Sequence, residues 1–254
     1  GGGGGGGGDG DDGDGGDDGG GGGGGSAGEG GGAVATARPA VPSACDEDDA
    51  FDPGPTMPRR LSQVEYVNTV RDLLGDEIAV AVVFPPDEEM LGYDNNASGL
   101  QVSPIHTERY MESAEAIASQ VVDTLLDVLP CDPEPDPRAC AQRFLETFGL
   151  RAWRRPLADP ELDRYMGVYD AIMEGGETSF PEAIEVLVSG LLQSPHFLYR
   201  IEVGLPDAER PDLRTLTSFE MASRLSYFIW RSMPDEALLE AATNGGLLTP
   251  ESLA

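Results

Sequence analysis

Helix-start signals recur along this chain and constrain its fold more than any other feature. Ser62, Ser179 and Thr217 are each followed three residues later by Glu, the pattern of a capping box. Ser103-Pro104 and Asp159-Pro160 are two further starts, with Pro in the first turn. Runs of alternating apolar and polar residues, which indicate strands, are absent from the sequence that follows the first start. The sequence predicts an all-α fold of small helical domains packed in series.

Apolar residues at three- and four-residue spacing follow each start and predict which face of each helix is buried. In the first helix these are Leu61, Val64, Val67, Val70 and Leu74. In the helix after Thr217 they are Met221, Leu225, Phe228 and Ile229. Helices are expected at 62–75, 103–129, 141–153, 159–175, 179–191, 217–229 and 234–245, and the stretch 79–100 is expected to be a long loop.

The N-terminal part has a different composition. Residues 1–32 are almost entirely Gly and Asp and contain no aromatic or branched apolar side chain. Such a segment buries too little surface to offset chain entropy, so residues 1–58 are predicted to be a disordered, self-repelling tether. The alternative for the Asp cluster is loose binding of divalent cations.

The chain is strongly acidic. It has 46 Asp and Glu against 16 basic residues, all of them Arg, and a net charge of −30. The first 32 residues carry seven of the acids, which leaves −23 on the rest. This charge repels nucleic acid and anionic lipid, so neither is expected as a partner. No run of 18 apolar residues is present, so no membrane span is expected.

Three cysteines occur. Cys131 and Cys140 enclose a loop too rich in Pro to be helical, and a disulfide between them is favoured over two separate buried thiols. A short loop closed in this way is typical of exported proteins. Cys45 has no evident partner and no lipoprotein signal before it. A helix start at Thr249-Pro250-Glu251 lies close to the last residue, and the chain is therefore interpreted as a fragment.

Five short strings carry a family resemblance. They are EYVNTVRDLLG (65–75), GYDNNA (92–97), RRPL (154–157), SPHFLYR (194–200) and ASRLSYFIW (222–230). In this order they resemble the planctomycete-specific domains of unknown function, which also occur in exported myxobacterial proteins. Residues 59–123 resemble the third domain of the series, 138–202 the fifth and 215–254 the start of the fourth.

The resemblance implies a location and a domain plan. Members of the family are large exported or lipid-anchored proteins, many with c-type cytochrome domains. This chain has no Cys-x-x-Cys-His, so haem is expected only in domains outside it. No catalytic residue is carried over from the family. The predicted domains are 59–130, 131–204 and 213–254, behind the tether.

The acidic loop is the best candidate for a site. Asp87, Glu88, Asp94, Asn95 and Asn96 offer hard oxygen ligands that suit calcium, and the amides also suit sugar hydroxyls. Their spacing does not match the helix–loop–helix calcium motif. The alternative is structural, because Asp and Asn stabilise turns by bonding their own backbone.

The other polar candidates each have a structural reading. His106 and His196 are the two histidines, and neither has a metal ligand at suitable spacing on its own helix, so a metal or haem role is disfavoured. Ser194, Ser218 and Ser226 lie in no nucleophile elbow. Carboxylate pairs for glycoside hydrolysis need not be close in sequence, so 46 acids do not decide for or against them.

The arginines and aromatics of the last two domains are also open to two readings. Arg151, Arg154 and Arg155 either form ion pairs between domains, which is favoured, or hold an anionic ligand. The aromatic residues Tyr227, Phe228 and Trp230 are expected in the core, with the indole N–H bonded to one partner.

These observations favour a non-catalytic binding or scaffold region of a larger exported cell-envelope protein. It is expected in the periplasm or at the cell surface, with a lipid anchor on a segment not in the sequence as one option. Expected partners are other domains of the same chain, a polysaccharide or a cytochrome. The alternative is an exported redox or polysaccharide-processing enzyme whose chemistry lies in further domains. Whether the whole protein is an enzyme is left open.

Overall fold

The structure, a computed structural model, describes residues 56–248 except 82, 125–127, 208–209 and 211–212. Two compact units divide the chain, Gly1–Pro53 and Gly54–Ala254, and every described residue belongs to the second. Most of the predicted tether, Cys45 and the helix start at Thr249 lie outside the described residues.

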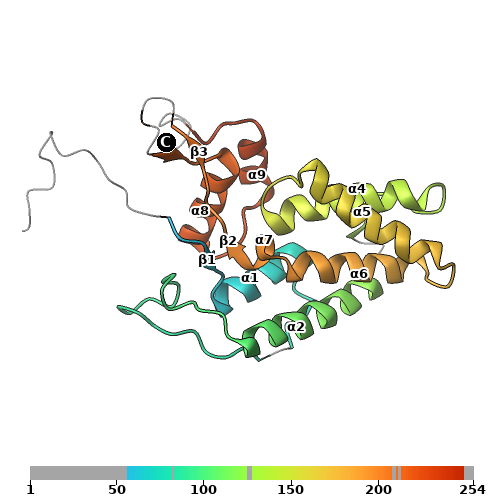
Figure 1. The fold of residues 1–254 in the computed structure, drawn as a ribbon, viewed down its shortest axis with the longest axis horizontal. Helices are drawn as coiled ribbons and strands as arrows, with labels where there is room; N and C mark the ends of the chain where they lie inside the picture. The colour runs from blue at the N-terminus through green and yellow to red at the C-terminus, as the bar shows by residue number, and fades with distance from the viewer. Residues whose placement is uncertain (1–55, 82, 125–127, 208–209, 211–212, 249–254) are drawn as a thin grey trace, which may run out of the picture. The chain divides into compact units, whose positions relative to one another are not determined.

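Helices make up most of the described part, so the predicted all-α class is confirmed (Figure 1). They are α1 (Gln63–Leu74), α2 (Pro104–Asp123), α4 (Pro137–Trp153), α5 (Asp159–Glu174), α6 (Phe180–Gln193), α7 (Pro195–Leu198), α8 (Ser218–Trp230) and α9 (Glu236–Thr243). Two antiparallel pairs of two-residue strands accompany them: β1 (Arg59–Arg60) with β2 (Tyr199–Arg200), and β3 (Leu205–Pro206) with β4 (Arg214–Thr215). In the first pair Arg59 lies opposite Arg200.

The predicted capping boxes form at the starts of α1 and α8. Ser62 accepts from the Glu65 N–H while Glu65 accepts from the Ser62 N–H, and Thr217 and Glu220 do the same. At Ser179 the Glu182 carboxylate accepts the backbone N–H. These bonds satisfy N–H groups that a helix start otherwise leaves unpaired.

Two predicted helix starts are wrong. The segment after Cys131 was expected to stay non-helical until Ala141, but α4 begins at Pro137 because the Asp136 side chain accepts the Ala139 N–H and Pro suits the first helical position. The last helix begins at Glu236 rather than at Pro234, with Asp235 as its cap.

The predicted buried faces of α1 and α8 are wrong in part. Val64 and Val67 are exposed, and Glu65 and Thr69 lie in the interior instead. On α8, Phe228 is 84% exposed and Ile229 65%, while small residues and Tyr227 face inward. Trp230 is also exposed, and its indole N–H donates to the Met233 carbonyl at 3.1 Å. Buried polar side chains with internal partners shift both faces away from the apolar pattern.

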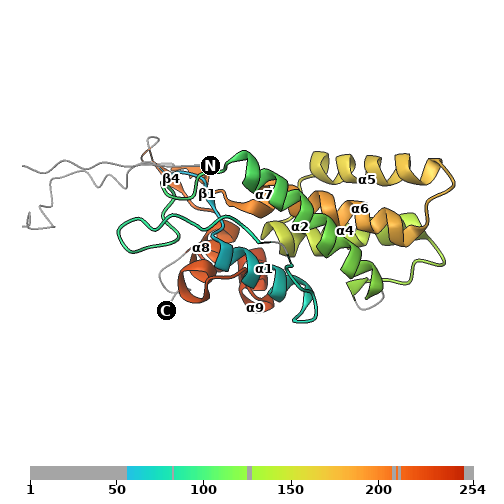
Figure 2. The same cartoon turned by 90° about the horizontal axis from the view of Figure 1, so that it is seen from below.

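One hydrophobic cluster contains residues from all three predicted domains. Tyr66, Ile117, Phe144, Leu187 and Tyr227 are among its buried members. Helix α6 packs against α2, α4 and α5, as the two views show (Figures 1 and 2). A smaller cluster joins α8 to α9. The division into domains at 59–130, 131–204 and 213–254 stays a prediction.

A disulfide joins Cys131 to Cys140, with their Cα atoms 5.7 Å apart. It ties the start of α4 to the segment before it. Among the described helices, none combines the length and the apolar composition that crossing a bilayer requires.

Candidate functional site

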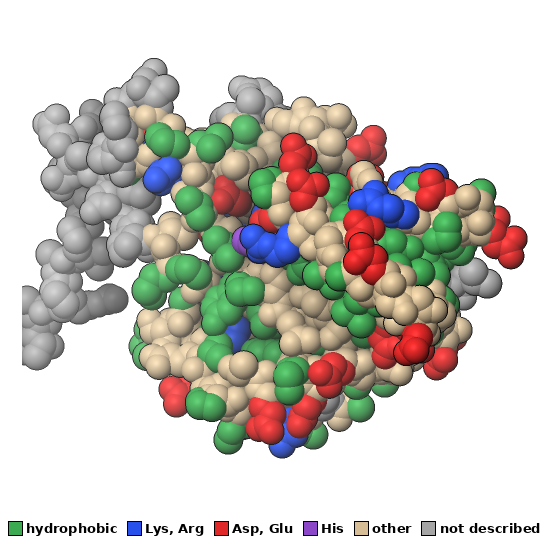
Figure 3. Space-filling model, turned by 45° about the vertical axis from the view of Figure 1, so that its right-hand side comes forward, with side chains coloured by type: hydrophobic (Ala, Val, Ile, Leu, Met, Phe, Trp, Pro, Cys, Tyr) green, Lys and Arg blue, Asp and Glu red, His purple; other side chains and the backbone are tan. Residues whose placement is uncertain are grey.

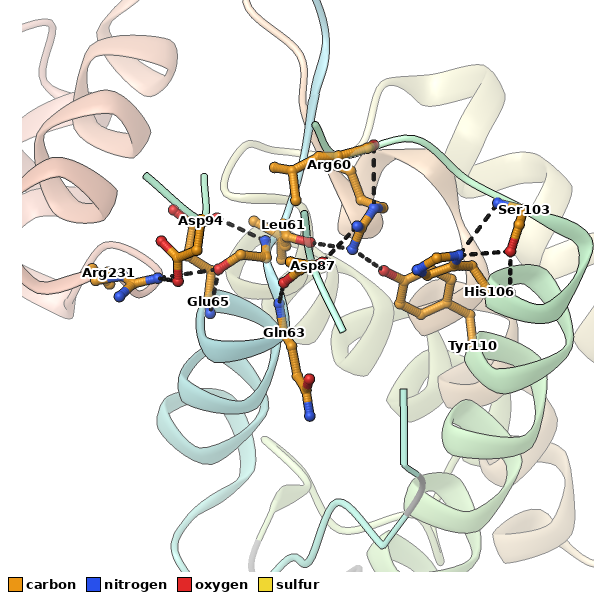
Figure 4. Close-up of polar contacts among 12 residues, drawn as sticks. Arg60, Leu61, Gln63, Glu65, Asp87, Asp94, Ser103, His106, Tyr110 and Arg231 are labelled. Atoms are coloured by element: carbon orange, nitrogen blue, oxygen red, sulfur yellow. Dashed lines mark hydrogen bonds and ion pairs between the residues drawn. The ribbon is translucent and has the colours of Figure 1, made fainter. Parts of the chain in front are cut away.

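Two ion pairs attach the acidic loop before α2 to the rest of the structure, and the first is formed by Asp87 (Figure 4). Arg60 is almost fully buried and donates to Asp87 Oδ1 at 2.7 Å. The other oxygen of Asp87 accepts the Gln63 N–H at 2.6 Å, at the N-terminus of α1. Arg60 also donates to the Tyr110 hydroxyl at 2.9 Å. Asp87 is therefore neutralised by an arginine and by the helix end.

Asp94 forms the second ion pair of the loop: its carboxylate accepts a hydrogen bond from Arg231 at the end of α8 (Figure 4). Arg231 has a left-handed backbone, with φ of 56°, and donates also to the Ser62 hydroxyl at 3.3 Å. Its carbonyl accepts from the Asn68 side chain at 3.2 Å. The loop is thus joined to both α1 and α8.

The five predicted metal ligands have separate surroundings. Asp87 and Asp94 are bonded to different arginines, and the Asn96 side-chain oxygen accepts the Ser98 N–H at 3.0 Å. No side-chain hydrogen bond of Glu88 or Asn95 was found within the described residues. In that part of the chain, no three His, Cys, Asp or Glu residues form a cation-binding group. Calcium binding at this loop stays a prediction.

A pocket of about 1070 Å³ opens beside the loop. Its walls come from the loop residues 92–97, from β1 and β2, and from α8. The second, fourth and fifth family strings, GYDNNA, SPHFLYR and ASRLSYFIW, thus each contribute residues to the pocket, although they lie apart in sequence. Sites that gather segments in this way are typical of ligand binding.

Arginines dominate the charges of this pocket. Four line it, Arg59, Arg200, Arg224 and Arg231, against the two carboxylates of Asp94 and Glu202. Arg224 pairs with Glu202, and Arg231 with Asp94. On the face drawn in Figure 3, by comparison, several arginines are scattered among a larger number of carboxylates and hydrophobic side chains. A local excess of positive charge on a chain of net charge −30 therefore marks this pocket.

Three of these arginines have an unsatisfied donor. The Nε atoms of Arg59, Arg200 and Arg231 are buried and have no hydrogen-bond partner among the described residues. Arg200 is only 6% exposed. Its guanidinium lies over the Tyr227 ring at 5.2 Å, and a terminal nitrogen lies 3.9 Å from Glu65 Oε1, an atom that is also buried without a hydrogen bond. Buried donors of this kind cost free energy unless an acceptor reaches them.

The electrostatics of Arg200 agree with this description. Burial lowers its pKa, and the neighbouring Arg59 lowers it further. The Glu65 carboxylate carries the opposite charge, but it lies too far from the Arg200 guanidinium for a normal hydrogen bond. An anion between Arg59 and Arg200 would relieve their mutual repulsion and satisfy their donors.

A second pocket of about 450 Å³ shares Arg200 and Glu202 with the first and is lined in part by Trp153, Arg155 and His196. Arg155 holds Glu161 with two bonds of 2.8 Å. His196 packs on Trp153, with 4.7 Å between ring centres, and its Nε2 lies 3.4 Å from Glu161. Burial lowers the pKa of His196, as does Arg155. Arg155, Glu161 and His196 thus already bond to one another.

The pairing of Arg155 with Glu161 makes a pH-dependent contribution to stability. The Arg155 hydrogen bond, the largest favourable effect, lowers the pKa of Glu161 to about 2 from its ordinary 4.5. The stabilisation is therefore complete above pH 4.5 and is lost as the pH falls toward 2. Glu161→Gln should flatten the decline of melting temperature in this window, and exposed Glu174→Gln should leave it unchanged. Equal acid slopes in wild type and Glu161→Gln would contradict this role.

The expectation of ion pairs between domains is wrong for Arg154. Its buried guanidinium bonds the carbonyls of His196, Phe197 and Tyr199 at 2.6, 3.2 and 2.9 Å. Arg155 pairs within its own segment, and Arg151 donates to the Asp72 carbonyl at 2.8 Å. All three arginines thus bond to other groups of the protein and stabilise its fold.

His106 lies near the first ion pair of the loop, that of Arg60 with Asp87. Its Nδ1 lies 2.8 Å from the Ser103 hydroxyl, at the start of α2, and its Nε2 is buried without a partner among the described residues (Figure 4). Burial lowers its pKa, and so does Arg60. A neutral imidazole that caps a helix accounts for this residue.

Sequence reasoning selected the loop side of the pocket and missed its arginines. Asp94, Asn95 and Asn96 were candidates and do line it. Arg59 and Arg200 were not, since nothing near them in sequence indicates a site. The available signal was Arg200 at the end of the SPHFLYR string and Arg59 at the start of the segment 59–123, in a chain that is otherwise acidic.

Three family models match the chain, each described as a protein of unknown function. DUF1587 (PSD3) matches residues 59–123, DUF1595 (PSD5) residues 140–202, and DUF1592 (PSD4) residues 216–254. Neither the curated proteins nor the solved structures gave a match. The pocket is lined by residues from all three matched segments, with Arg59 in the first, Arg200 in the second and Arg224 in the third.

Proposed function

We propose that this chain, which belongs to the planctomycete-specific series through its PSD3, PSD5 and PSD4 domains, is a binding region of an exported cell-envelope protein and takes an anionic ligand in the arginine pocket. The observation that carries the proposal is Arg200, a buried arginine whose Nε has no partner among the described residues and which faces Arg59 across the strand pair. Carboxylate and phosphate are the groups that such arginines bind.

The balance of charges limits the ligand. Asp94 and Glu202 match two of the four pocket arginines, and Glu65 lies 3.9 Å from a third, Arg200, so a ligand of low negative charge completes the neutralisation. At longer range the chain is negative and repels large polyanions. A ligand that carries one or two negative charges satisfies both conditions.

The disulfide supports an extracytoplasmic location, because such bonds persist in oxidising compartments. On this proposal the protein acts in the periplasm or at the cell surface, and other domains of the same protein are its partners. Calcium is not needed for anion binding, since the arginines supply the positive charge.

Arg59→Gln tests the binding. Arg59 lines the pocket and makes no ion pair within the described residues, so its loss should leave the fold intact. Inorganic phosphate and acetate, titrated at constant ionic strength and followed by NMR chemical shifts, should bind Arg59→Gln about tenfold more weakly than wild type, the effect of one charge-assisted hydrogen bond.

Arg164→Gln is the matched control, because it removes the same charge from an exposed position on α5. It should bind both anions as wild type does. If wild type binds neither anion, or if the two variants weaken binding equally, the pocket is not an anion site and a scaffold role without this ligand remains.

A further inference from the structure

We infer that the anionic ligand of the pocket is a sugar acid, such as a uronic acid residue. The pocket would recognise its carboxylate and one apolar face of its ring. The inference rests on the proposed function, because it takes the arginines as the anion site. It adds the chemistry of the remaining pocket wall.

The size of the pocket exceeds that of a simple anion. Its volume is about 1070 Å³, whereas pockets for ligands of drug size span about 300–1,000 Å³. An acetate or a phosphate bound to Arg59 and Arg200 leaves most of the wall without contact. The rest of the ligand must therefore suit the groups beyond the arginines.

Exposed aromatic and apolar side chains form one part of that wall. Phe228 is 84% exposed, and Tyr93 and Met57 are also largely exposed. Single exposed apolar residues are ordinary, but three around one arginine-lined pocket form a surface that a partner can cover. A pyranose ring presents a face of C–H groups that packs on such rings, and the Tyr93 hydroxyl remains available for a hydrogen bond.

Amides and a hydroxyl form another part of the wall. Asn95, Asn96 and Thr56 line the pocket, and of the two amides only the oxygen of Asn96 has a hydrogen bond within the described residues. An amide both donates and accepts, which matches neighbouring sugar hydroxyls. Arginine, amide and aromatic groups together fit a carboxylated sugar better than a hydroxyl-free acid or a neutral sugar.

The charge balance favours a single acidic sugar over a long acidic polymer. Beyond the pocket the chain carries a large excess of carboxylates. A polymer of uronates extending from the pocket would meet this negative charge, while a free sugar acid or a terminal residue would not. Salt should accordingly weaken the binding of the sugar acid.

The test compares D-glucuronate with D-glucose, acetate and inorganic phosphate on the full chain by NMR titration. Glucuronate should bind about tenfold more tightly than acetate, because the ring adds contacts that acetate lacks, and glucose should bind more weakly than either. Phe228→Ala should weaken glucuronate about fivefold or more and leave acetate unchanged. Its melting temperature should stay near that of wild type, since the side chain is exposed.

Ile229→Ala is the matched control: it is exposed on the same helix but does not line the pocket. This substitution should change the affinity for neither glucuronate nor acetate. If acetate and phosphate bind but glucuronate shows no advantage, or if Phe228→Ala and Ile229→Ala behave alike, the sugar acid is wrong while the anion site stands. If no anion binds, the proposed function fails as well.

Discussion

Arg154→Met is expected to lower the free energy of unfolding by about 3–5 kcal/mol, one of the two largest effects expected for a single substitution. Arg154 is 3% exposed, and its guanidinium donates to four backbone carbonyls and to the Tyr227 hydroxyl. These acceptors belong to the end of α4, to α7, to β2 and to α8. Methionine keeps the volume but leaves the buried carbonyls without a donor, which urea unfolding measures.

Arg164→Met provides the comparison, because Arg164 is exposed on α5 and lies only ten residues away. It should cost less than about 0.5 kcal/mol. A loss at Arg154 as small as this would mean that water reaches the carbonyls, and the role of this arginine in joining the helices would be wrong.

Arg60→Met is expected to lower the free energy of unfolding by about 3–5 kcal/mol as well, because it leaves a buried carboxylate without its cation. The Asp87 side chain is 8% exposed and would keep only the Gln63 N–H. The loop that carries Asp94 should loosen at the same time. Hydrogen exchange of residues 84–100 measures that loosening alongside urea unfolding.

Two variants separate burial from charge. Arg109→Met removes an arginine from an exposed pair with Glu112 and should cost less than about 1 kcal/mol. Adding Asp87→Asn to Arg60→Met should recover part of the loss, since the carboxylate then no longer lies buried and unpaired. A double variant as unstable as the sum of the two single ones would contradict the pairing.

Helix starts were predictable from sequence because their signals are local. Ser62 and Glu65, or Thr217 and Glu220, lie three residues apart and bond to each other in the structure. The buried faces were less predictable. Glu65 and Thr69 are polar but buried, because Glu65 caps its own helix and Thr69 bonds the Tyr227 hydroxyl at 2.8 Å. That partner lies 158 residues away, beyond any periodicity.

The candidate site, too, was predictable from the sequence only in part. The loop was recognisable because Asp and Asn cluster in a short stretch. The arginines of the pocket were not, since Arg59 and Arg200 become neighbours only when β1 pairs with β2. Phe228 was assigned to the core because its apolar character gives no sign that Ala222 and Ser226 take the inner face.

The arginine Nε–H signals in an NMR spectrum test the anion site most directly. The chain has 16 arginines and no lysine, and single Arg→Lys variants assign each signal. On addition of inorganic phosphate, the Nε–H signals of Arg59, Arg200 and Arg231 should shift and saturate together, while those of Arg154 and Arg164 stay in place. If the pocket signals do not move, or move no more than that of exposed Arg164, the arginine pocket does not bind anions.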